Sequence, residues 1–202
     1  MTKNILQLKI VLADSRPLIW RRILVSAEST FFDLHVAIQD AFGWQDSHLH
    51  QFFTALPYGR NRNYQVIAYP MPEMEDVVDE RKVKLSKWFK NPKDKLWYEY
   101  DFGDTWMHEI TFEKVIQPES NAKCPQLVDG AQACPPEDCG GIGGYEHLLE
   151  VLANPKDEEH KDMLDWLGIE TPTEFDPAHF DKKEVKFRDP QKVLKQYVRN
   201  MR

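Results

Sequence analysis

The stretch YEYDFGDTWMHEI, residues 98–110, decides the fold, because it predicts two strands and the turn between them. The runs KLWYEYDF and TWMHEITFEKVI, which contain it, are rich in the aromatic and branched residues that strands favour. Gly103 and Asp104 between them suit a tight hairpin turn. We therefore expect a hairpin within an antiparallel sheet.

Upstream of the hairpin, the sequence predicts more strands and one helix. Alternating or branched apolar residues indicate strands at residues 5–12, 18–25 and 48–54. Thr30 followed by Asp33 is a capping-box signal, so a helix is expected to begin there, run to Phe42 and end at Gly43. His35 falls on the apolar stripe of this helix, which predicts a buried packing role for it.

The remaining segments are less regular and end in helices. Residues 57–94 are expected to form short pieces and exposed loops, and residues 117–144 a turn-rich loop. Apolar spacing predicts helices over residues 145–153, 157–167 and 190–198. The order predicts an α+β fold, a mainly antiparallel sheet with one early helix packed on it and a helical C-terminal third. We expect a single domain over residues 1–202, with a core at about 5–167 and a C-terminal helical extension at 168–202.

Composition limits the classes of partner. The chain has 202 residues and a formal net charge of -7, which repels nucleic-acid phosphates and makes nucleic acid an unexpected partner. The sequence lacks a run of about 20 apolar residues and a signal-peptide pattern, so neither membrane insertion nor export is expected. Three cysteines without a disulfide framework fit a reducing compartment. These features predict a cytoplasmic protein.

Histidines supply the first candidate site. His48 and His50 are two residues apart on a predicted strand, so their side chains should leave one face about 6–7 Å apart. That spacing suits a pair of metal ligands, although a third ligand is needed. Two surface histidines at this spacing also occur by chance.

The hairpin supplies further candidates. Alternation places Tyr98 and Tyr100 on one face of the incoming strand, and Trp106 and His108 on one face of the outgoing strand. Asp101 and Asp104 flank the turn, where aspartate commonly bonds its own backbone. A turn-forming role for these two acids and a role in a site are equally consistent with the sequence.

The loop CPPEDCGGIGGY, residues 134–145, supplies two more carboxylates. Its prolines stiffen one flank of Glu137 and Asp138, and its glycines permit close backbone approach on the other. Unsatisfied N–H groups where the following helix begins could face an anionic ligand. The Lys-Ser/Thr ending of a phosphate-binding loop is absent from the sequence.

The cysteines suggest two weaker alternatives. Cys124, Cys134 and Cys139 contain no Cys-x-x-Cys spacing, so a closed zinc site would need a histidine as its fourth ligand. Cys139 could act as a nucleophile only if a histidine base lies beside it in the fold.

Four motifs in this order, PLIWRRILV, TFFDLHVAIQDAFGWQDSHLHQF, YEYDFGDTWMHEI and PPEDCGGIGGY, resemble the plasmid pRiA4b ORF-3-like family. The resemblance covers the chain from Leu6 to about Leu167. It implies a single α+β domain and relatives that are in part carried on plasmids and insertion elements, and it implies no particular activity. The family pattern contains every candidate residue named next, but neither Cys124 nor Cys134.

We predict that these segments converge on one cleft lined by aromatic and ionisable groups. The candidate ligand-binding residues are His48, His50, Tyr98, Tyr100, Asp101, Asp104, Trp106, His108, Glu137 and Asp138. Nitrogen from His48, His50 and His108 with oxygen from the acids would suit a divalent transition metal as cofactor. The leading hypothesis is thus a ligand- or metal-binding module for an unidentified small molecule or protein.

Two other functions remain open from the sequence. A metal-assisted hydrolase would need an open coordination position and a bound water. An interaction protein associated with mobile elements would need an exposed patch, such as one around Arg21 and Arg22. Core packing and satisfied hydrogen bonds could also account for each candidate residue singly.

Overall fold

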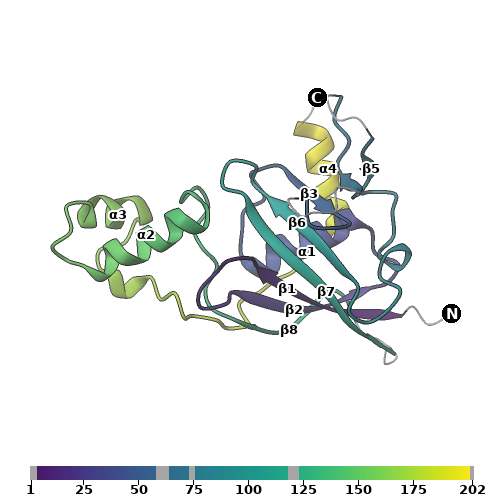
Figure 1. Ribbon diagram of the computed structural model, residues 1–202, viewed down its shortest axis with the longest axis horizontal. Helices are drawn as coiled ribbons and strands as arrows, with labels where there is room; N and C mark the ends of the chain where they lie inside the picture. The colour runs from purple at the N-terminus through teal and green to yellow at the C-terminus, as the bar shows by residue number, and fades with distance from the viewer. Residues whose placement is uncertain (1–3, 58–63, 73–75, 118–122, 201–202) are drawn as a thin grey trace.

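A computed structural model describes residues 4–57, 64–72, 76–117 and 123–200. Within these residues the chain forms one mixed α+β domain, in which a mostly antiparallel sheet is combined with helices (Figure 1). The strands follow the order β5-β4-β3-β6-β7-β1-β2-β8 across the sheet. Among the strand pairs that the structure describes, the short contact between β4 and β5 is the one parallel pair. The predicted fold class is confirmed.

The sheet is built around the predicted hairpin. In the described residues its eight strands are β1 (Ile5–Leu12), β2 (Trp20–Ser26), β3 (His50–Phe53), β4 (Val66–Ala68), β5 (Val78–Asp79), β6 (Lys95–Tyr100), β7 (Trp106–Ile116) and β8 (Gln126–Ala131). β7 is the longest and pairs with both β6 and β1, so it joins the two halves of the sheet. In Figure 1 the strands run at different angles to one another, because the sheet is twisted.

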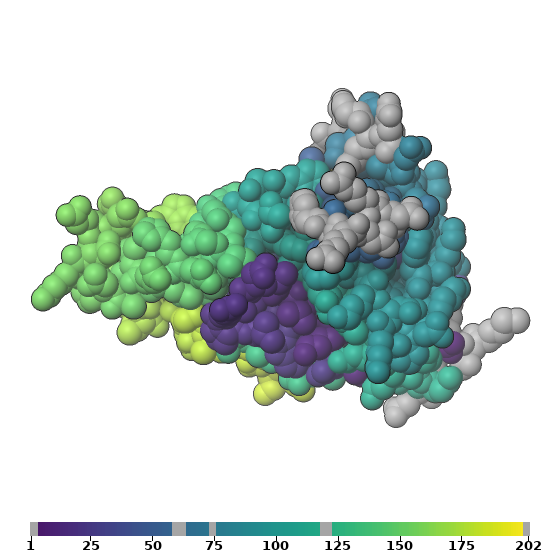
Figure 2. Space-filling view, in the orientation of Figure 1, coloured from purple at the N-terminus to yellow at the C-terminus, as the bar shows by residue number. Residues whose placement is uncertain are grey.

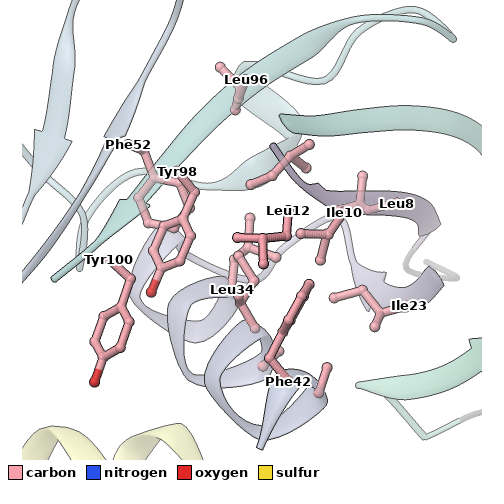
Figure 3. Packing of buried hydrophobic residues seen from close by; sticks show 14 of the residues in the cluster. Leu8, Ile10, Leu12, Ile23, Leu34, Phe42, Phe52, Leu96, Tyr98 and Tyr100 are labelled. Carbon is pink, nitrogen blue, oxygen red and sulfur yellow. The ribbon is translucent and has the colours of Figure 1, made fainter. Parts of the chain in front are cut away.

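Helix α1 (Phe31–Phe42) covers one face of the sheet, and its ends are those that the sequence predicts. Thr30 and Asp33 form the capping box in both directions, and Gly43 ends the helix in the left-handed conformation at φ 88°. The helix buries residues such as Leu34 and Phe42 against Ile10 and its neighbours from β1 (Figure 3). This contact is the centre of the hydrophobic core.

Three local predictions are wrong. Residues 117–144 are not all loop, because β8 pairs with β2 inside that segment. The connection between β6 and β7 is longer than a tight turn at Gly103-Asp104, since Tyr100 pairs with Trp106 across a loop of residues 101–105. His48 does not lie on a strand with His50, because β3 begins only at His50.

The helices that follow the sheet lie in two different places. Helices α2 (Gly141–Ala153) and α3 (His160–Leu167) form a lobe that extends away from the sheet (Figures 1 and 2). The chain then returns, and α4 (Pro190–Asn200) packs on α1 through a small cluster of Phe32, Val36 and Val193. The C-terminal segment therefore contributes directly to the central domain. None of the helices in the described residues has the length and apolar character needed to cross a bilayer.

Candidate functional site

The aromatic face of the hairpin is part of the core. Tyr98, Tyr100, Trp106 and His108 are each fully buried, with 0% of their surface exposed. In Figure 3 Tyr98 and Tyr100 extend from β6 beside α1, with Phe52 of β3 next to Tyr98. The predicted alternation of these side chains is correct, and most of the face that they share is filled by packing.

The Tyr98 hydroxyl contacts a buried polar network, which we call the His35 network. The hydroxyl of Tyr98 lies 2.9 Å from His35 Nδ1 and accepts a hydrogen bond from Gln39 Nε2 at 3.0 Å. His35 Nε2 lies 2.8 Å from Asp46 Oδ1. Tyr197 of α4 donates to the same Asp46 oxygen at 2.6 Å. The network therefore joins β6, α1, the segment before β3 and the last helix.

His50 belongs to this network and not to a surface pair with His48. Its ring stacks on that of His35, with ring centroids 3.4 Å apart and an interplanar angle of 2°. His50 Nε2 lies 2.8 Å from Glu80 Oε2, and both side chains are buried. Burial and the neighbouring His50 lower the pKa of His35, which keeps it neutral and able to donate from Nε2 to Asp46.

Asp46 is a buried carboxylate of the network. Burial raises the pKa of its carboxyl group, but the hydrogen bonds from His35 and Tyr197 outweigh burial and leave the pKa below its ordinary value. Arg188 also approaches, with Nη2 3.7 Å from Asp46 Oδ2. The carboxylate is thus engaged by the protein itself.

His108 is also separate from the other histidines. Its Nδ1 lies 2.9 Å from the carbonyl oxygen of Trp106, and its ring packs edge-on against Phe42 and Trp44. Burial lowers its pKa to about 3, so the imidazole is neutral. His108 and His50 are both part of the core, and neither lies with His48 in a group of potential metal ligands.

One group of potential metal ligands is found in the described residues, and it consists of His48, Asp101 and Asp138. One ligand atom from each lies within 4.8 Å of the others. His48 Nε2 is 3.1 Å from Asp138 Oδ1, and His48 Nδ1 is 3.7 Å from Asp101 Oδ2. The side chain of Asp138 is 68% exposed and that of His48 is 29% exposed. We call these three residues the His48 cluster.

The backbone fixes both carboxylates of the cluster. Asp101 and Asp138 adopt the left-handed conformation, at φ 57° and 61°, which is uncommon for residues other than glycine although aspartate tolerates it. Asp101 Oδ1 accepts a hydrogen bond from the N–H of Gly103, which leaves Oδ2 facing His48. The Asp101 N–H donates to the Leu49 carbonyl at 2.9 Å, which joins the hairpin to the chain beside His48. Asp101 thus forms the turn hydrogen bond that the sequence allowed, and the same side chain also lies beside His48.

The separation between His48 and Asp138 suits a metal ion. Ligand atoms at about 2.0–2.2 Å from a tetrahedral zinc ion are about 3.3 Å apart, close to the contact between His48 Nε2 and Asp138. His48 Nε2 is buried and lacks an aligned hydrogen-bond partner in the described residues, despite that nearby oxygen. A nitrogen in this position has a lone pair available for a cation when the proton resides on Nδ1.

Glu137 and Asp104 lie next to the cluster, but their carboxylates accept hydrogen bonds from other groups of the protein. Glu137 accepts a short hydrogen bond from the Tyr100 hydroxyl, and its other oxygen accepts from the Gln45 N–H. Asp104 Oδ2 accepts from the N–H of Gly140 at 3.2 Å, at the start of α2, which begins at Gly141 and not at the predicted residue 145. These two acids hold the Pro-rich loop against the hairpin and thereby place Asp138.

The structure supports neither a cysteine nucleophile nor an exposed patch around Arg21 and Arg22. The thiols are free, and burial raises the pKa of both Cys134 and Cys139, the latter to about 12, which disfavours a nucleophilic thiolate. Arg21 is 4% exposed and donates to backbone carbonyls, including that of Ala41 at 2.9 Å. Arg22 forms a two-pronged ion pair with Glu113. These two arginines therefore do not form an exposed basic patch.

A pocket of about 490 Å³ adjoins the His48 cluster. Its lining includes His48 and Asp101 together with Leu49, Phe102 and Tyr197. The last three were not among the predicted site residues. Phe102 lies inside the quoted DFGD motif, where an aromatic residue in a turn is the one available signal, whereas nothing in the sequence connects Tyr197 to this region.

Comparisons with known proteins identify relatives. A family model described as plasmid pRiA4b ORF-3-like protein matches residues 4–184. The uncharacterized protein y4hQ of Sinorhizobium fredii is 34% identical over 172 residues, which cover 83% of each chain. A crystal structure of a protein of unknown function, MM3350 from Methanosarcina mazei, is similar with a TM-score of 0.79 and 38% identity. That match covers 93% of this chain and 100% of the other.

Proposed function

Because the chain belongs to the plasmid pRiA4b ORF-3-like family, whose relatives above are named without an activity, we propose a function from the site itself. The protein is a metal-binding module that holds one divalent transition metal through His48, Asp101 and Asp138. The observation that carries this proposal is the buried His48 Nε2, which lacks an aligned hydrogen-bond partner in the described residues yet lies 3.1 Å from a carboxylate oxygen.

The chemistry of the donors supports a transition metal over calcium or magnesium. One imidazole nitrogen and two carboxylate oxygens form a mixed set that zinc, manganese and iron accept, whereas calcium and magnesium prefer oxygen alone. The two aspartates would balance the charge of a divalent ion. Asp138 is mostly exposed, so solvent can reach the cluster.

Zinc binding by purified, tag-free protein tests the proposal. Isothermal titration calorimetry and elemental analysis should give about one zinc per chain for the wild type. Replacing His48 with Ala or Asp138 with Asn should weaken zinc binding more than about 100-fold, since changes in residues that merely support metal ligands already cost about 10–100-fold. His50 is left intact, because its buried ring supports the core.

Two exposed residues provide matched controls. His147 is an exposed histidine on α2, and Asp165 is an exposed aspartate on α3, and both lie outside the His48 cluster. His147→Ala and Asp165→Asn should bind zinc as the wild type does. A wild-type protein that binds no zinc, manganese or iron, or an Asp138→Asn variant that retains full affinity, would refute the proposal.

Metal-assisted hydrolysis is a second candidate function, favoured by the number of ligands. Catalytic zinc sites commonly use three protein ligands and leave a position for water, whereas structural sites use four. The His48 cluster has three ligands and an exposed side. Hydrolysis of 4-nitrophenyl ester and phosphate substrates that requires added metal and disappears in Asp138→Asn would support this function. Full metal binding without turnover of any of these substrates would favour the binding module alone.

A further inference from the structure

The pocket beside the His48 cluster combines metal ligands with exposed apolar side chains. His48 and Asp101 belong to both the cluster and the pocket lining. Its volume of about 490 Å³ falls within the range of about 300–1,000 Å³ typical of small-molecule sites. A molecule in this pocket would therefore lie directly beside a metal held by the cluster.

Two apolar residues of the pocket lining are exposed to solvent. Leu49 is 46% exposed and Phe102 is 40% exposed, and both line the pocket. Single exposed apolar residues are ordinary, but two that border one pocket next to a polar cluster form a surface that a ligand can cover. The hydrogen bond between the Asp101 N–H and the Leu49 carbonyl, at 2.9 Å, fixes the backbones that carry these side chains.

Asp46 and Tyr197, which also line the pocket, are engaged with each other. The Asp46 carboxylate accepts from Tyr197 at 2.6 Å and lies 2.8 Å from His35 Nε2. The Tyr197 hydroxyl uses its proton in that contact. The ionisable groups of the lining that are left to receive a ligand are thus His48 and Asp101. The lining therefore combines His48 and Asp101 with two exposed apolar side chains, Leu49 and Phe102.

We propose that this pocket takes a small amphiphilic ligand that coordinates the metal through an oxygen-donor anion, of the carboxylate or hydroxamate class, and packs an apolar group on Leu49 and Phe102. This inference rests on the proposed metal site. The two aspartates of the cluster neutralise a divalent metal, so a ligand with a single negative charge adds only one net charge. Leu49 and Phe102 then select aromatic or branched ligands over small polar ones.

Hydroxamates of two sizes test the inference. Acetohydroxamate and benzohydroxamate share the metal-binding group and differ in apolar size. Zinc-loaded wild-type protein should bind benzohydroxamate about tenfold or more tightly than acetohydroxamate, since single methylene groups in apolar pockets change affinity by about tenfold. Replacing Phe102 with Ala should reduce that ratio toward one without changing zinc affinity. Elemental analysis after titration checks that the hydroxamate has not removed the zinc.

Val128→Ala is the matched control, because Val128 is 36% exposed and lies on β8, on the far side of the sheet order from β3 and β6. It should leave the affinity ratio unchanged. Zinc binding with equal ratios in wild type and Phe102→Ala would overturn this inference while leaving the metal-binding function intact. Failure to bind zinc at all would overturn both, so the two results are distinguishable.

Discussion

Replacing Tyr98 with Phe tests the buried network that underlies the site. The substitution removes one hydroxyl group from a fully buried ring and changes nothing else in its shape. It leaves His35 Nδ1 and the Gln39 amide without the partners that lie 2.9 Å and 3.0 Å away. Gln39 Oε1 already lacks a partner in the described residues, so the substitution would leave the whole Gln39 amide unpaired.

The expected cost follows from the groups left unpaired. A buried polar group without a hydrogen bond costs about 1–3 kcal/mol, and two such groups that partly relax give about 3 kcal/mol. A domain of this size has a free energy of unfolding of about 5–15 kcal/mol, so the loss is a substantial fraction. For about 200 residues it corresponds to a lowering of Tm by about 6–12 °C.

Urea unfolding followed by circular dichroism measures the effect, provided that the slope m is unchanged. Tyr69→Phe is the control, because the Tyr69 hydroxyl makes no hydrogen bond within the described part of the chain. It should remain within about 0.5 kcal/mol of the wild type. A Tyr98→Phe protein as stable as the control would show that the hydroxyl does not carry the network.

Two further substitutions probe the loop and the core. Gly141→Ala should destabilise the protein by about 2 kcal/mol, because Gly141 has φ +69° and a Cβ atom there would lie 2.4 Å from the Asp104 carbonyl oxygen. Gly143→Ala, with nothing described within 4 Å of its Cβ position, should be neutral or stabilising, and the opposite ranking in urea unfolding would contradict the close approach of Gly141 to Asp104. Burial lowers the pKa of His108 to about 3, below its value near 6.5 in the unfolded chain, so the unfolded state gains the proton first. Stability should therefore fall by up to about 1.4 kcal/mol per unit as the pH decreases from 6.5 toward 3, and His108→Gln should reduce that slope, whereas an unchanged slope would contradict a neutral buried His108.

The elements that the sequence predicts well are those with a local physical signal. The hairpin follows from alternating aromatic residues, and α1 follows from Thr30, Asp33 and Gly43. β8 has no such signal, because it is an edge strand that is largely exposed and needs no alternation of apolar residues. A strand of this kind is specified by its partner β2.

The site is predicted less completely because it depends on contacts between distant segments. His48 and Asp101 come together with Asp138 through the hydrogen bonds of Asp101 and Glu137, which local patterns do not encode. The buried polar network around His35 and Asp46 includes Tyr197 from α4, a contact that sequence spacing cannot indicate. The alternation rule placed His48 and His50 on one strand face, and it failed because β3 begins after His48.

Anomalous diffraction from crystals grown with zinc tests the central claim most directly. Data collected on both sides of the zinc absorption edge locate the metal without reference to activity. We predict one strong anomalous peak within about 2.0–2.3 Å of His48 nitrogen and of oxygen atoms from Asp101 and Asp138. A zinc-loaded crystal with no peak at these three residues, or with its metal bound elsewhere, would contradict the account.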